Sequence, residues 1–271
     1  MKPLTRFFLV ALFLFSAMLA AAQAPAKAAP TAKTPEESDD YNKATSVSGG
    51  AASAQAADDF STKYPDSELR VFLYAKALHD YQAENNSAKM REMGEKVLTL
   101  DKDNIIALVM TSVALSGDLP AAADEKKKAV DEVHANAKHA IDGMDANFAA
   151  PDGATPDQIT AYKNTFLSLA HLSIGTVALK TDSFAEAETE LKQAAALNRD
   201  PSNVSTWYLL ALAQDHLNKF KDGIATCDQA IKMAAAGSQI ATSIASERDR
   251  LVKLDAQASK PKPKPRAASK K

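Results

Sequence analysis

Apolar side chains recur every three or four residues along most of this chain, and polar residues fill the positions between them. This spacing gathers apolar side chains on one face of an α-helix, whereas a half-buried strand needs strict alternation. Short turns that contain Gly, Pro, Asn or Asp separate the periodic segments and end the helices. The pattern predicts helices over residues 34–47, 51–64, 69–81, 89–100, 105–115, 121–149, 155–179, 184–197, 207–217, 220–235 and 238–256.

Two of the predicted helix pairs repeat one pattern at a fixed offset. Phe184 and Phe220 are 36 residues apart, and the residues around them match at the same offset. Such a self-match is typical of stacked repeats, because a single helix pair cannot bury its apolar face alone. The residues expected to pack the repeats together are Gly175, Phe184, Ala187 and Ala194 in the first copy and Trp207, Leu210, Ala211, Phe220, Gly223 and Ala230 in the second.

The repeated positions resemble those of the tetratricopeptide repeat (TPR) family, an array of antiparallel helix pairs of about 34 residues. The resemblance is best over 165–236, where Cys227 stands in a slot that usually holds an aromatic residue. It is weaker over 69–116, where Leu78 is large for a slot that usually holds a small residue. The resemblance implies an all-α fold over 34–256: a TPR-like α-solenoid of about five antiparallel helix pairs with a C-terminal capping helix.

The N-terminal residues differ from this helical region and read as a signal peptide over 1–22. Lys2 and Arg6 precede an apolar stretch, and Ala20-Ala21-Ala22 offers a small-residue cleavage site. The apolar stretch is short for a membrane span of about 20 residues, so an uncleaved anchor is the second reading. No cysteine lies near the cut to carry a lipid anchor. We therefore expect a periplasmic or secreted protein, with residues 23–33 as a disordered Ala/Pro/Lys spacer.

Charge is distributed unevenly along the chain. The formal net charge is −2, but the last twelve residues carry six basic side chains, and residues 257–271 are predicted to be a disordered basic Pro/Lys tail. Setting aside those six and the two basic residues of the leader leaves −10 for the remainder. An acidic body argues against nucleic acid as a partner, because phosphate contacts need clustered positive charge. The tail is suited to weak contact with anionic envelope material.

The sequence lacks the residue patterns of the common catalytic and metal sites. It contains no Gly-rich phosphate loop and no Gly-x-Ser-x-Gly turn, and its single cysteine, Cys227, falls in an apolar helix slot. His134 and His139 are five residues apart, whereas two metal ligands on one helix face are four apart. We predict that the chain is not an enzyme and has no catalytic residue, cofactor or metal. An enzyme that uses Asp215 and His216 is the least favoured alternative.

The remaining possibility is a binding surface. In the TPR family the exposed side of each first helix lines a concave groove, and the resemblance implies that the partner-binding residues here are Phe72, His79, Val109, Val113, Leu172, Thr176, Tyr208, Leu212, Asp215 and His216. This row is mostly apolar and largely lacks the Lys and Asn with which some family members clamp a terminal carboxylate. The prediction is a protein–protein interaction scaffold that binds another envelope or secreted protein.

Two alternatives stay open. Part of this chain could fill the groove itself, and this reading is slightly favoured because large exposed apolar patches are uncommon on monomers. Alternatively, the basic tail binds anionic polymer or lipid, and the helices merely display it.

Overall fold

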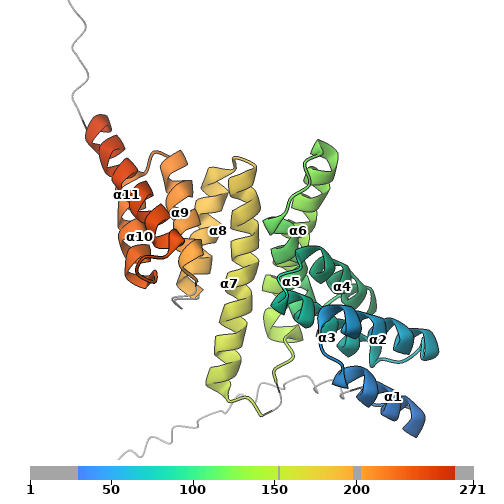
Figure 1. The fold of residues 1–271 in the computed structure, drawn as a ribbon. Coiled ribbons are helices and arrows are strands. Elements are labelled where there is room, and N and C mark those ends of the chain that lie inside the picture. Colours follow the sequence, from blue (N-terminus) through green and yellow to red (C-terminus); the bar gives the residue numbers. More distant parts are fainter. Residues whose placement is uncertain (1–29, 152, 198–202, 260–271) are drawn as a thin grey trace, which may run out of the picture. The chain divides into compact units, whose positions relative to one another are not determined.

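The computed structural model describes residues 30–151, 153–197 and 203–259, and within them all regular structure is helical. The chain divides into two compact units after Pro30, and the helices belong to the second, Thr31–Lys271. The predicted leader, most of the spacer and residues 260–271 of the predicted tail lie outside the described residues. The helices are α1 (Pro35–Ser46), α2 (Gly50–Lys63), α3 (Arg70–Ala83), α4 (Ser87–Leu100), α5 (Ile105–Gly117), α6 (Ala123–Asn147), α7 (Pro156–Lys180), α8 (Phe184–Leu197), α9 (Val204–His216), α10 (Phe220–Met233) and α11 (Gln239–Ala258) (Figure 1).

Consecutive helices pack against each other as pairs, from α1 with α2 to α9 with α10. Neighbouring pairs are joined because the first helix of each pair also packs against the pair before it: α3 against α2, α5 against α4, α7 against both α5 and α6, and α9 against α8. The last helix, α11, packs against α10 and α9. The all-α class, the five helix pairs and the final capping helix are therefore confirmed. Among the described residues, none of the helices is both long enough and apolar enough to span a membrane.

Polar side chains fix several helix starts. Thr34 accepts a hydrogen bond from the backbone N–H of Glu37, and Thr155 forms a capping box with Gln158. The Asn86 side chain accepts from a backbone N–H in the first turn of α4, so that helix begins at Ser87, two residues before the predicted start. The ninth helix was predicted to begin at Trp207, but α9 begins earlier in the chain, at Val204.

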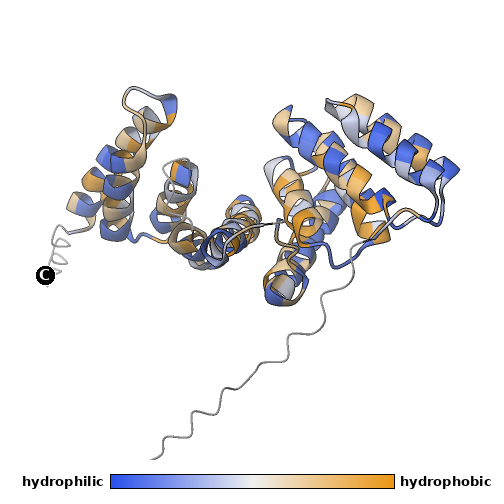
Figure 2. Ribbon diagram, turned by 90° about the horizontal axis from the view of Figure 1, so that it is seen from below, coloured by the Kyte–Doolittle hydropathy of each residue, from blue (hydrophilic) through white to orange (hydrophobic). Residues whose placement is uncertain are grey.

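The helix α5 is enclosed by its neighbours. Val109 is fully buried in a cluster that includes Ala137 of α6 and Ile174 of α7. Leu169 of α7 packs against this cluster and also against the cluster of the preceding pairs. Most helices carry both apolar and polar residues, as the hydropathy colouring shows (Figure 2). In contrast, α5 buries most of its length, because α4, α6 and α7 all pack on it.

In two of the helix pairs, a glycine on one helix faces a leucine on the other. In the α7–α8 pair, Gly175 faces Leu191, and a Cβ added at position 175 would lie 2.6 Å from Leu191 Cγ. In the α3–α4 pair the order is reversed, with Leu78 on the first helix and Gly94 on the second, but a Cβ at position 94 would lie at an ordinary contact distance of 3.4 Å from Leu78 Cδ1. The residues of both pairs are 16 positions apart in the sequence. Leu78 is buried in a slot predicted to need a small residue, and Gly94 makes room for Thr111 of α5, because a Cβ at position 94 would lie 2.2 Å from Thr111 Oγ1.

Candidate functional site

The ten predicted partner-binding residues do not form one uniformly exposed row. Three are exposed, one is fully buried, and the remainder are partly buried. Val109, the buried residue, cannot touch a partner in this arrangement because α6 and α7 cover it. The exposed residues are Phe72, His79 and His216, and the partly buried ones are Val113, Leu172, Thr176, Tyr208, Leu212 and Asp215.

Two large apolar side chains are exposed on α3 and α5, the first helices of successive pairs. Phe72 is 44% exposed, and Ile106 is 39% exposed. Both begin the same three-then-four spacing along their helices, which places them at equivalent positions of neighbouring first helices. We call Phe72 and Ile106 the first-helix patch. The sequence pattern places Ile106 on the same helix face as Val109 and Val113, but Ile106 was not among the ten predicted residues.

Asp215 and His216 are each engaged elsewhere in the chain. Arg250 of α11 donates a hydrogen bond to the Asp215 carboxylate and another, of 2.8 Å, to Glu247. These contacts, led by the one with Glu247, raise the pKa of the Arg250 guanidinium. The His216 ring stacks on Phe184 with centroids 4.0 Å apart and planes 4° from parallel. Asp215 therefore ties α9 to the capping helix, His216 ties α9 to α8, and these contacts do not pair the two residues as an acid and a base.

Other candidates on α7 and α9 also make contacts within the chain. Leu172 packs against the cluster around Leu191, and the Thr176 hydroxyl donates to the Leu172 carbonyl at 2.7 Å. Tyr208 packs against the cluster that contains Cys227. Burial raises the pKa of the Cys227 thiol to about 11, so at neutral pH it stays protonated. In the described part of the chain, no group of three or more His, Cys, Asp or Glu side chains is placed to hold a metal ion.

Glu188 of α8 is a charged link between the fourth and fifth pairs that the sequence did not reveal. Its side chain is only 7% exposed and lies within 2.6 Å of Lys192 on the same helix. It also accepts a hydrogen bond from Lys219, in the turn before α10. Burial raises the pKa of this carboxyl, but the hydrogen bonds from both lysines outweigh that effect, so the net pKa is lowered.

We expect Glu188→Gln to destabilise the protein by about 1.5 kcal/mol at pH 7, because the variant loses charge-assisted hydrogen bonds that are partly screened by solvent. A carboxyl with a lowered folded pKa stabilises the fold above its unfolded pKa, near 4.5, and this contribution disappears as the pH falls through the folded value. Urea unfolding at several pH values from 3 to 7 measures the difference between variant and wild type, which should be constant above about pH 5 and shrink toward pH 3. Glu186→Gln, an exposed change on the same helix, is the control. A difference that is constant with pH would contradict the electrostatic account.

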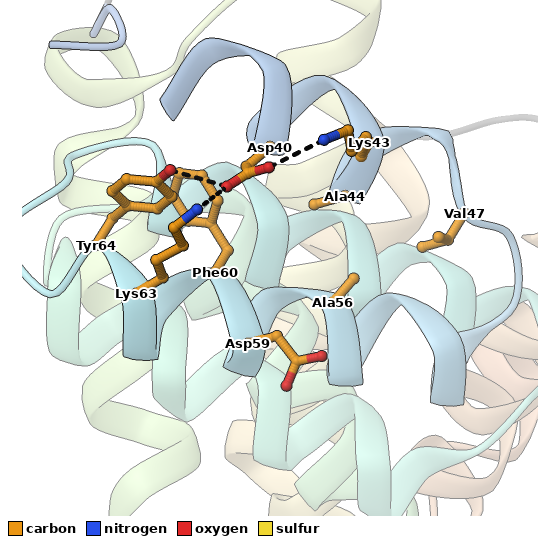
Figure 3. Close-up of a pocket in the computed structure, with 9 residues that line it drawn as sticks. All are labelled: Asp40, Lys43, Ala44, Val47, Ala56, Asp59, Phe60, Lys63 and Tyr64. Carbon is orange, nitrogen blue, oxygen red and sulfur yellow. Dashed lines mark hydrogen bonds and ion pairs between the residues drawn. The ribbon is translucent and has the colours of Figure 1, made fainter. Parts of the chain in front are cut away.

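A surface groove of about 290 Å³ lies between α1 and α2 (Figure 3). We call it the α1–α2 groove. Asp40 bridges the two helices at its rim: Lys63 binds the carboxylate at 2.7 Å, and the Tyr64 hydroxyl donates to it at 2.8 Å. These hydrogen bonds, led by the one from Lys63, hold the pKa of Asp40 well below its usual range. The lining residues are Asp40, Lys43, Ala44, Val47, Ala56, Asp59, Phe60, Lys63 and Tyr64.

A second hollow lies beside the loop between α5 and α6, and the two lysines that line it donate hydrogen bonds within the chain. Lys180 Nζ donates to the carbonyls of Ser116 and Gly117, both at 2.7 Å. Lys126 Nζ donates to the Lys180 carbonyl at 3.3 Å. The two lysines thus cap the C-terminal ends of α5 and α7, where a positive charge interacts favourably with the negative end of the helix dipole. The polar groups of this hollow therefore hold helices together.

Comparison with known proteins gives matches at the level of structure. No protein-family model matches the chain, and a search of curated proteins finds no match. A solved structure described as TTC0263, a thermophilic TPR protein in Thermus thermophilus, is 15% identical with a TM-score of 0.47, covering 78% of this chain and 98% of that chain. A MamA RS-1 ArsTM double mutant is 14% identical with a TM-score of 0.41, covering 70% of this chain and 96% of that chain.

Proposed function

We propose that this chain is a non-catalytic scaffold that binds an apolar segment of another protein on the faces of α3 and α5. The observation that carries the proposal is the first-helix patch, in which Phe72 and Ile106 remain exposed at equivalent positions of the first helices of two successive pairs. Phe72 and Ile106 are already more than half buried, so covering the remainder of each side chain favours association by about 0.6–1.3 kcal/mol. The corresponding faces of α7 and α9 contribute less, because their candidates are engaged in internal contacts.

The partner proposed is another envelope or secreted protein. This part of the proposal rests on the leader-like residues 1–22, whose charged start, apolar stretch and small-residue site fit export to a periplasm or to the medium.

Site-directed photocrosslinking tests the proposed surface. A photoreactive phenylalanine analogue placed at position 72 or 106 is expected to give the same crosslinked product from both positions in the native host. The analogue at position 231 or 252 is the control, since Ile231 and Val252 are similarly exposed apolar residues, at 38% and 42%, on α10 and α11. Products that are equally frequent at all four positions, or absent at 72 and 106, would rule out the patch as the binding surface.

The alternative function assigns binding to the tail, on the evidence of its six basic side chains. In that case, deletion of residues 260–271 abolishes retention on anionic envelope material. A scaffold that binds through α3 and α5 keeps its partner after the same deletion.

A further inference from the structure

The α1–α2 groove combines a buried apolar floor with one partly exposed aromatic side chain. Phe60 and Ala44 are buried and form the floor, the Tyr64 ring lies 4.8 Å from the Phe60 ring between centroids, and the partly buried Val47 and Ala56 complete the apolar lining. Grooves that pair aromatic rings with small aliphatic residues suit proline, whose rigid ring gives up little conformational entropy on binding. The groove therefore favours an extended, proline-containing segment.

The first helix pair is also the acidic end of the repeat array. Residues 35–63 contain six acidic and two basic side chains. Both lysines already bind carboxylates, Lys43 at 3.2 Å and Lys63 at 2.7 Å from Asp40. Asp59, in contrast, lines the groove, is exposed and accepts a hydrogen bond from the neutral Gln55. The groove can therefore offer a carboxylate to a basic ligand.

The C-terminal sequence has the complementary chemistry. Residues 260–266 alternate basic residues with proline, and the last twelve residues contain six basic side chains and no acidic one. Alternating proline favours polyproline II, which has three residues per turn and a rise of about 3.1 Å per residue. On such a helix Pro263 shares an edge with Lys260 and Arg266, each about 9 Å away along the axis. One proline can then enter the groove while a basic side chain next to it reaches the Asp59 carboxylate.

The order of helix contacts favours a tail from another molecule. The described residues end at Ser259, directly after α11, which packs against α9 and α10, whereas α1 packs against α2 and α3. The four residues from Ser259 to Pro263 span at most about 14 Å, which is less than two steps between packed helices of about 8–10 Å each. We propose that the α1–α2 groove of one copy binds residues 260–266 of a second copy.

This contact joins two different surfaces of the same protein. A head-to-tail contact leaves a free tail at one end of the assembly and a free groove at the other, so more copies can add unless the rotation closes a ring. The proposal is independent of the first-helix patch, since it uses α1 and α2 instead of α3 and α5.

Two measurements test the proposal on a chain that starts at residue 23 and so retains all the described helices. Sedimentation velocity is expected to show association that rises with protein concentration, falls in 0.5 M salt and disappears when residues 260–271 are deleted. Fluorescence anisotropy of a labelled peptide of residues 260–271 should show saturable binding to the tail-deleted chain. An exposed ion pair contributes only a modest binding free energy. Asp59→Lys replaces an attractive charge by a repulsive one, so it should lower the affinity for the peptide about five- to tenfold.

Two controls separate groove binding from simple charge attraction. Asp124→Lys makes the same charge change at an exposed position of α6 and should leave the affinity nearly unchanged. A peptide with alanine at positions 261, 263 and 265 keeps all the charge and should bind at least fivefold more weakly. Equal affinity for both peptides, or equal loss in both protein variants, overturns groove docking. Tail-dependent binding to anionic vesicles without any tail-dependent self-association also overturns it and supports the alternative function.

Discussion

Gly175→Ala is expected to destabilise the protein by about 1–2 kcal/mol, although it places a stronger helix former in a helix. The added Cβ would lie 2.6 Å from Leu191 Cγ and 3.0 Å from Leu191 Cδ2. These atoms belong to a side chain that is fully buried, so they cannot swing into solvent. Leu191→Ala alone should cost about 3–4 kcal/mol, because it leaves a cavity in the α7–α8 interface.

The decisive result is a loss of most of the Gly175→Ala cost in the double variant. Once Leu191 is Ala, the nearest remaining atom to the new Cβ is the backbone nitrogen of residue 191, at 3.3 Å, a tight contact that needs only a small shift. Gly175→Ala should then cost at least about 1 kcal/mol less than it does in the wild type, because the clash with Leu191 is gone and alanine favours the helix. Urea unfolding of the four proteins measures the coupling. Gly117→Ala, where nothing lies within 4 Å of an added Cβ, is the matched control. Additive costs in the double variant would show that the two residues do not compete for space.

The sequence predicted the helices and their pairing well because both depend on local periodicity. The start at Ser87 was missed because the first turn of α4 carries no large apolar residue before Met90, and the start at Val204 was missed because the prediction began the helix at the next large apolar residue, Trp207. The role of Leu78 could not be predicted from one helix, since it depends on which residue the partner helix supplies. Gly94 on that partner helix makes room for the next pair instead, because a Cβ at position 94 would lie 2.2 Å from Thr111 Oγ1.

The candidate surface was harder to predict because exposure depends on contacts between pairs. Val109 was predicted to bind a partner and Ile106 was not, yet α6 and α7 bury Val109 and leave Ile106 exposed. Asp215 looked free in the sequence, but its partner Arg250 is 35 residues away on the capping helix. Each of these outcomes requires knowing how the 25-residue helix α7 and the final helix α11 lie against their neighbours.

Leu251→Ala in the capping helix is expected to destabilise the C-terminal end of the array by about 3 kcal/mol. Leu251 is fully buried in a cluster with Ala211, Cys227 and Ile244, and an added Cβ at Gly223 would lie 2.9 Å from its Cδ1 atom. It therefore fills the space that Gly223 leaves open between α10 and α11. In a repeat array each pair is stabilised mainly by its neighbours, so weakening the cap should loosen the terminal pair before the others.

The single tryptophan makes this local loss measurable. Trp207 packs against the same cluster, so its fluorescence reports on the C-terminal end of the array, whereas far-ultraviolet circular dichroism reports on all the helices. In Leu251→Ala the fluorescence transition in urea should move to a lower concentration than the dichroism transition, because the end of the array unfolds first. Val252→Ala changes an exposed neighbouring position. It should change the free energy of unfolding measured by either signal by no more than about 0.5 kcal/mol. If both signals move together in Leu251→Ala, α11 stabilises the whole array as one cooperative unit, and its role as a local cap is refuted.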